Sequence, residues 1–109
     1  MKEISYLDAL SRTVDKLSHG GVFLSVGGEN PNTMTIGWAS IGYIWAKPVF
    51  MALVRPQRHS YEMLKRAGEF TVSVPTQNAL KAELAFAGTK SGRDVDKFDG
   101  HGLTAIPAK

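Results

Sequence analysis

The chain opens with apolar residues that stand three or four positions apart: Ile4, Leu7, Leu10, Val14 and Leu17. Residues with this spacing share one face of an α-helix, and the run His19-Gly20-Gly21 then interrupts the pattern. The pattern therefore predicts an amphipathic helix at the start of the chain. We expect its apolar stripe to cover a sheet.

The next segments favour β-strands. Residues Val22 to Val26 form a short β-type run, and the turn-forming cluster that follows it predicts a hairpin. Residues Thr33 to Trp45 are rich in Thr, Ile, Trp and Tyr, and two glycines interrupt them, as in a strand that bends or admits another group close to its backbone. Residues Val49 to Val54 are all apolar, which predicts a strand buried on both sides.

A short helix is predicted between two strands, over residues Tyr61 to Ala67. Ser60 is a favourable N-cap, Gly68 stands where a C-cap belongs, and Glu62 and Arg66 form a favourable pair four residues apart. These local signals predict both ends of the helix.

The remaining segments alternate again between strand and helix. Residues Phe70 to Val74 alternate apolar with polar, as in a half-buried strand that Pro75 ends. We expect Thr76 to cap a further helix, closed by Gly88, whose apolar face holds Leu80, Leu84 and Ala87. The charged loop GTKSGRDVDKFDGHG follows, and GLTAIPAK resembles the start of a strand. This order predicts an α+β domain around a mainly antiparallel sheet or barrel.

Composition narrows the class of protein further. The 109 residues suffice for one domain, 1–109, and 43% hydrophobic with 21% charged residues is typical of a chain that folds. The absence of cysteine excludes disulfides, thiolate metal sites and a cysteine nucleophile, so any redox chemistry requires a bound cofactor.

No apolar run has the length of a signal peptide or membrane helix, and we expect a cytoplasmic protein. The net charge of +3 favours anionic partners.

Common catalytic motifs are missing, and no catalytic residue is predicted. The three histidines lack metal-ligand spacing, and neither GxSxG, GxGxxG nor a Walker sequence occurs. Asp94 and Asp96 stand beside basic residues, as in a solvated loop of mixed charge, which is a better interpretation than an acid/base pair.

Two basic segments could bind an anion such as phosphate. RPQRHS, residues 55–60, directly precedes a predicted helix N-terminus, and KSGR, residues 90–93, is a glycine-containing loop that could close over the same group. A simple cap at Ser60 with both arginines in water explains the first segment equally well. The uncharged strand from Thr33 to Trp45 could form an apolar wall for a flat ring with hydrogen-bonding edges. Alternatively, Trp38 and Trp45 are core or interface residues, an interpretation that is stronger for Trp45.

Three segments, NTMTIGWASIGYIWAKPVFMALVRPQRHSYEML, GEFTVSVP and FAGTKSGRDVDKF, occur in this order. Together they resemble the flavin reductase-like, or flavoredoxin, family over residues Tyr6 to Pro107. The resemblance implies an FMN-binding split β-barrel, antiparallel and Greek-key-like, with short flanking helices. It also implies a homodimer with the flavin near the subunit interface, reduced by NAD(P)H or by a redox protein.

The resemblance also assigns cofactor-binding residues. The isoalloxazine and ribityl chain would be lined by Asn32, Met34, Thr35, Trp38, Ala39 and Ser40. The phosphate would be surrounded by Arg55, Arg58, Ser60 and Tyr61, and the site closed by Ser91, Gly92, Arg93 and Lys97. Members often carry Cys where this chain has Ala87, which excludes a thiol role. Members also continue for many tens of residues past GLTAIPAK, so we expect either a fragment or a barrel that is completed differently.

Three functions remain open from the sequence. The first is an FMN-dependent oxidoreductase that reduces free flavin, ferric complexes or a protein partner, since flavin supplies the hydride chemistry itself. The second is a flavin-carrying electron-transfer module without turnover of its own. The third is a small basic module that stacks nucleic-acid bases on aromatic residues. Lys and Arg are not interleaved with the aromatic residues of Thr33 to Ala46, which makes nucleic acid an unlikely partner.

Overall fold

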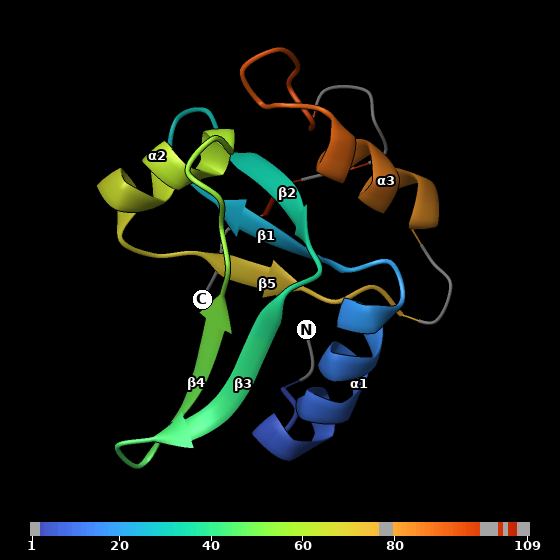
Figure 1. Ribbon diagram of the computed structural model, residues 1–109, viewed down its shortest axis with the longest axis vertical. Helices are drawn as coiled ribbons and strands as arrows, with labels where there is room; N and C mark the ends of the chain where they lie inside the picture. Colours follow the sequence, from blue (N-terminus) through green and yellow to red (C-terminus); the bar gives the residue numbers. More distant parts are fainter. Residues whose placement is uncertain (1–2, 77–79, 99–102, 104, 107–109) are drawn as a thin grey trace.

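The computed structural model describes residues 3–76, 80–98, 103 and 105–106. Its elements follow the order α1 (Tyr6–Ser18), β1 (Val22–Val26), β2 (Asn32–Ile36), β3 (Ala39–Ile44), β4 (Lys47–Ala52), α2 (His59–Ala67), β5 (Thr71–Ser73) and α3 (Lys81–Thr89) (Figure 1). Most of the strand expected in GLTAIPAK lies outside the described residues, and the three described positions there form no strand.

The strands form two antiparallel sheets. One sheet has the order β2-β1-β5, with Leu24 of β1 opposite Met34 on one side and Val72 on the other. The other is the hairpin β3–β4, which projects away from the first sheet (Figure 1). Within the described residues the two sheets do not close on each other. The predicted α+β class is confirmed, and the open sheets are consistent with a split barrel.

The core lies on both faces of the central strand β1. Val22, Leu24 and Val26 point to one face, where they pack with Met63 of α2, and Phe23 points to the other, where it packs with α3. Alternate side chains of a strand face opposite sides, so β1 is buried by a helix on each side. This placement brings the start of α2 and the end of α3 to the same strand, β2, from its two sides (Figure 1).

The expectation that the apolar stripe of α1 covers a sheet is met at Leu17, which packs against the core on the three-stranded sheet, but not at the exposed residues of the stripe. Leu7 is 72% exposed, Val14 is also exposed, and the buried residues of the helix are Thr13 and Lys16. The reason is that α2 and α3 already cover the three-stranded sheet, while α1 contacts it mainly at β1. The helix itself forms as its spacing predicts, with Ser5 accepting a capping hydrogen bond from the Asp8 amide.

Two strand predictions also require correction. The predicted strand from Thr33 to Trp45 is interrupted at Gly37 and Trp38, where the chain leaves one sheet and enters the other. The segment Val49 to Val54 is not buried on both sides, because β4 pairs with β3 in a hairpin whose outer face is uncovered within the described residues. Met51 is 54% exposed and Leu53 is 65% exposed.

Helix α3 begins later than predicted. Thr76 does not cap it, because the helix starts at Lys81 after Leu80, whose backbone is left-handed with φ 62°. Leu80 is 39% exposed, while Leu84 and Ala87 are buried as the pattern predicted. The helix continues one residue past Gly88, to Thr89.

The turn of the β3–β4 hairpin explains the position of Trp45. Trp45 and Ala46 both have left-handed backbone, with φ 54° and 60°, as the tight two-residue turns of hairpins require. Trp45 is 92% exposed, so within the described residues it does not belong to the core. No helix in the described part of the chain has the length and apolar character to cross a membrane.

Candidate functional site

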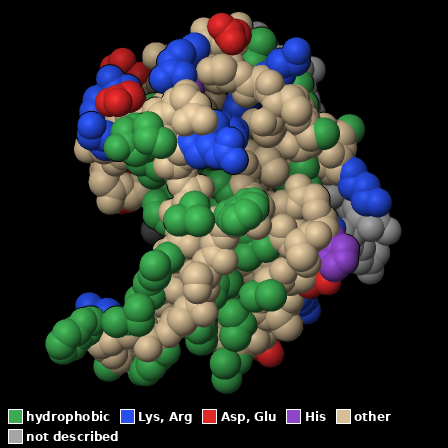
Figure 2. Space-filling view, viewed as in Figure 1, with side chains coloured by type: hydrophobic (Ala, Val, Ile, Leu, Met, Phe, Trp, Pro, Cys, Tyr) green, Lys and Arg blue, Asp and Glu red, His purple; other side chains and the backbone are tan. Residues whose placement is uncertain are grey.

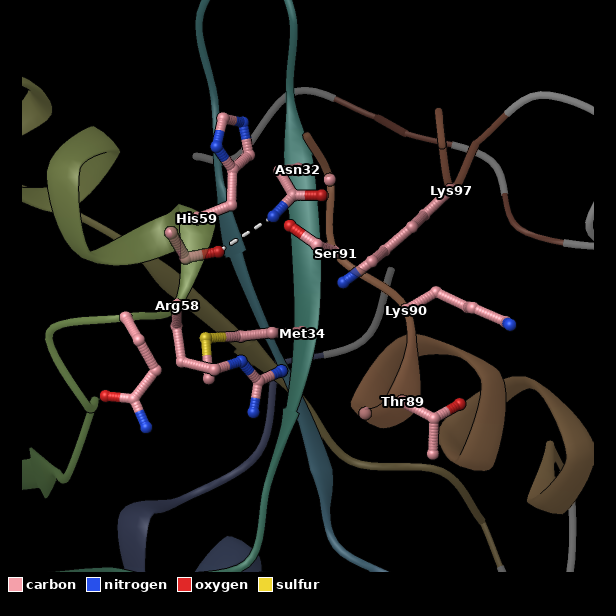
Figure 3. A pocket seen from close by; sticks show the side chains of 12 residues that line it. Asn32, Met34, Arg58, His59, Thr89, Lys90, Ser91 and Lys97 are labelled. Atoms are coloured by element: carbon pink, nitrogen blue, oxygen red, sulfur yellow. Dashed lines mark hydrogen bonds between the residues drawn. The ribbon is translucent and has the colours of Figure 1, made fainter. Parts of the chain in front are cut away.

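Ser60 links the start of α2 to strand β2. The sequence favours Ser60 as the N-cap, but the structure places Arg58 there, without a capping hydrogen bond from its side chain within the described residues. Ser60 lies inside the first turn, almost fully buried, and its hydroxyl oxygen accepts a hydrogen bond of 2.9 Å from Nδ2 of Asn32 (Figure 3). The cap prediction fails because the helix begins at His59, which places Ser60 inside the first turn.

A cavity of about 210 Å³ lies beside this link. Three parts of the chain line it: strand β2, the loop and first turn of α2, and the end of α3 with the loop after it (Figure 3). The lining residues are Asn32, Met34, Gln57, Arg58, His59, Ser60, Gly88, Thr89, Lys90, Ser91, Gly92 and Lys97. None of these described residues is acidic, and Arg58, Lys90 and Lys97 bring cationic groups.

Lys97 is the most unusual of the lining residues. Its side chain is only 2% exposed, and Nζ donates hydrogen bonds to the carbonyl oxygens of Thr33, at 2.7 Å, and Ala87, at 2.9 Å. Burial and then the nearby Arg58 guanidinium lower the pKa of Lys97 to about 8. An ammonium group has three N–H donors, so two carbonyl partners leave one donor for a ligand in the cavity.

Two other basic groups of the cavity, Arg58 and His59, are half-buried, whereas Lys90 is exposed. Burial and then Arg55 lower the pKa of Arg58. Burial lowers the pKa of His59, and the charges of Arg93, Lys97 and Arg66 lower it further. These cations destabilise one another, and none of the described lining residues is a carboxylate that could neutralise them. An anion bound between them would therefore stabilise their charged forms.

The loop after α3 forms part of the wall of this cavity. The backbone of Gly92 lies so close to strand β2 that a Cβ there would be 2.5 Å from Oδ1 of Asn32. Arg93 does not line the cavity; its Nη1 donates a hydrogen bond of 3.0 Å to the carbonyl oxygen of Gln57. A side chain at position 92 would therefore displace the Asn32 side chain, and the loop closes one side of the cavity.

A second, mainly apolar hollow of about 330 Å³ lies where β2 passes into β3. It is lined by Gly37, Trp38, Ala39, Ser40, Met51 and Leu53. The Leu53 amide donates to the Trp38 carbonyl at 3.2 Å, which holds the two strands of this wall together. On the face shown in Figure 2, basic side chains gather directly beside hydrophobic ones that continue onto the hairpin.

The structure brings most of the predicted site residues to these two hollows. The basic cavity holds Asn32, Met34, Arg58, Ser60, Ser91, Gly92 and Lys97, and the apolar hollow holds Trp38, Ala39 and Ser40. Four others line neither hollow: Thr35, Arg55, Tyr61 and Arg93. Thr35 instead donates to the Leu84 carbonyl, and the ring of Tyr61 lies under Nζ of Lys65, 5.5 Å from its centroid.

Sequence reasoning missed five residues of the basic cavity: Gln57, His59, Gly88, Thr89 and Lys90. Gln57 and His59 lie inside the segment RPQRHS, and the other three directly precede or begin KSGR. Both segments are predicted from the sequence to bind an anion, so the signal for this cavity is present in the sequence. Single residues within them could not be ranked because the direction of each side chain depends on the fold.

The fold and the basic cavity define a mixed α and β protein with a cavity lined by basic and polar groups. A family model described as "Flavin reductase like domain" matches residues 14–109, and the chain therefore belongs to the flavin reductase-like family. The structure is similar to the flavoredoxin of Desulfovibrio vulgaris (Miyazaki F), with a TM-score of 0.73 and 29% sequence identity. That match covers 82% of this chain and 49% of the flavoredoxin chain.

Two curated relatives are uncharacterized proteins of archaea. One, from Archaeoglobus fulgidus, is 33% identical over 88 residues, which cover 80% of this chain and 49% of the relative. The other, from Pyrococcus abyssi, is 28% identical over 83 residues, covering 75% of this chain and 45% of the relative. The chain thus spans about half the length of the curated relatives it matches.

Proposed function

We propose that this protein binds FMN and acts as a flavin reductase-like oxidoreductase. One observation carries the proposal: Arg58 and Lys97 meet at a cavity of about 210 Å³ in which none of the described lining residues is acidic. The phosphate of FMN supplies the anion that these cations lack. Riboflavin has no phosphate and would leave the repulsion between them unrelieved.

The donors of the cavity fit a phosphate group. Lys97 has one N–H beyond its two carbonyl partners, and Arg58 can present its guanidinium. The oxygen of Ser60 accepts from Asn32, which leaves the hydroxyl proton able to donate. The helix N-terminus at Arg58 favours negative charge as well.

The apolar hollow would hold the isoalloxazine ring. Trp38, Met51 and Leu53 give it apolar surface, and backbone groups of the β2–β3 connection are available to the polar edge of the ring. When bound, flavin supplies the hydride and single-electron chemistry. The residues of the chain bind the cofactor, orient it and leave one side of the hollow open to a second reactant.

The electron donor in this proposal is NAD(P)H or a redox protein. The openness of the apolar hollow supports direct access, because Trp38 is 76% exposed. Anaerobic mixing with NADH or NADPH bleaches the flavin of an enzyme, and a ferric complex added afterwards accepts the electrons and restores the colour. An electron-transfer module is not bleached by NADH or NADPH, because it requires a protein donor. Either result leaves FMN binding intact.

We also propose that the protein forms a homodimer through the β3–β4 hairpin. Tyr43, Ile44, Trp45 and Met51 are exposed large apolar residues gathered on this hairpin. A patch of this kind on a soluble fold is commonly covered by a symmetric partner.

The phosphate assignment is tested with one substitution and two ligands. Arg58→Ala removes a charge-assisted hydrogen bond worth ~1.5 to 3 kcal/mol, so FMN affinity should fall roughly ten- to a hundredfold. Riboflavin affinity should stay the same. Arg12→Ala, an exposed arginine on α1, is the matched control for the loss of one positive charge. Flavin fluorescence titration measures both ligands, and an equal loss for FMN and riboflavin would contradict the assignment.

A further inference from the structure

Arg93 joins two segments that are far apart in sequence, across one side of the basic cavity. Its Nη1 donates to the carbonyl oxygen of Gln57 at 3.0 Å, a separation of 36 residues. Gln57 lines the cavity in the loop before α2, and Arg93 belongs to the loop after α3 but does not line the cavity. We call this contact the Arg93–Gln57 bridge.

The loop that carries Arg93 is a formed turn. The Arg93 amide donates to Oγ of Ser91 at 3.1 Å, and the Ser91 carbonyl accepts from the amides of Asp94 and Val95, at 3.0 and 3.1 Å. These local bonds direct the Arg93 side chain toward the α2 loop.

Close packing supports the same closed position of the loop. A Cβ on Gly92 would lie 2.6 Å from Cδ2 of His59, as well as in contact with Asn32. The loop backbone at Gly92 therefore packs against the side chains of Asn32 in β2 and of His59, the first residue of α2. The bridge and this contact are two independent connections between the two sides of the cavity.

We propose that Arg93 is a positioning residue that holds the 90–93 loop closed over the bound phosphate group and so slows its departure. The inference rests on the proposed function, in which that phosphate belongs to FMN. It differs from the role that the family resemblance implies, since the guanidinium is committed to a carbonyl oxygen of the protein. Ligand release then requires an opened loop, and its rate follows the population of that open state.

The first test uses the ligand-free protein. Arg93→Gln should accelerate amide hydrogen exchange of Asp94 and Val95 in its own loop. It should also accelerate exchange of Arg58, whose amide is bonded to the Arg55 carbonyl at 3.0 Å in the opposite loop. Loss of one solvent-exposed hydrogen bond predicts roughly a two- to tenfold effect. A residue that only contacts phosphate would leave the Arg58 amide unchanged, and that result would overturn the bridge.

The second test measures FMN binding kinetics by stopped-flow fluorescence. The matched control is Arg66→Gln, which removes a charge that also acts on His59 but lies in the last turn of α2. Arg93→Gln should raise the FMN dissociation rate roughly two- to tenfold and should not slow FMN association relative to the control. An unchanged dissociation rate, or slower association than in the control, would overturn the proposal. If wild type binds no FMN, the proposed function fails, and hydrogen exchange still decides the bridge.

Discussion

The buried ammonium group of Lys97 should give this protein a distinctive dependence of stability on pH. In the unfolded chain a lysine titrates near its ordinary pKa of ~10.4, whereas in the fold burial and Arg58 lower the pKa of Lys97 to about 8. Between these two values the unfolded chain holds a proton that the native protein has released. Stability should therefore rise with pH across this window, and the cost of the buried charge is fully present below about pH 8.

The size of the effect follows from the shift. Each pKa unit corresponds to ~1.4 kcal/mol, so the free energy of unfolding should gain roughly 3 kcal/mol between about pH 8 and about pH 10.5. The side chain is 2% exposed, so solvent screening reduces this value little. The two carbonyl partners, Thr33 and Ala87, remain hydrogen-bond acceptors for the neutral amine.

Urea denaturation of wild type and Lys97→Met across this pH range measures the effect. Methionine fills much of the same volume but loses the bonds to Thr33 and Ala87, so absolute stabilities will differ and the pH slopes are compared. The difference between the two proteins should change by up to roughly 3 kcal/mol with pH. Parallel curves would refute the reasoning, because they would show that Lys97 titrates alike in the native and unfolded chain.

FMN affinity should depend on pH in the opposite direction. An anion beside Lys97 raises the pKa of its ammonium group again, so binding above pH 8 requires proton uptake. The FMN dissociation constant of wild type should rise with pH above about 8, by at most tenfold per unit. Riboflavin, which has no phosphate, serves as the control and should show no such rise.

Three further substitutions test the packing and the assembly. Ser60→Ala removes the acceptor for the buried Asn32 amide and should cost ~1 to 3 kcal/mol in urea denaturation. Gly21→Ala should destabilise more than Gly28→Ala, since both have positive φ but only at Gly21 would a Cβ meet other atoms; equal losses would contradict this. Trp45→Ser should convert the proposed homodimer to a monomer in light scattering, and its thermal midpoint at low protein concentration should not fall.

Local sequence determined the elements whose signals lie within a few residues. The spacing of apolar residues in α1, the β-type run of β1 and Gly68 at the end of α2 each depend on neighbours along the chain, and the structure confirms all three. The basic segments RPQRHS and KSGR were also visible in the sequence, because charge and glycine are properties of composition. Family membership required only the order of three motifs.

Tertiary structure decided what each of these residues contacts. Ser60 has the sequence signature of a cap, yet Asn32, 28 residues away, determines its hydrogen bond. Lysine side chains usually lie on the surface of a protein. Lys97 is buried because its Nζ donates hydrogen bonds to a carbonyl oxygen of β2 and to one of α3. The apolar residues of α1 are regularly spaced, but most of them are exposed, because α2 and α3 cover the two faces of the three-stranded sheet. Periodicity is set by adjacent residues, whereas burial and pKa are set by whichever distant segments pack there.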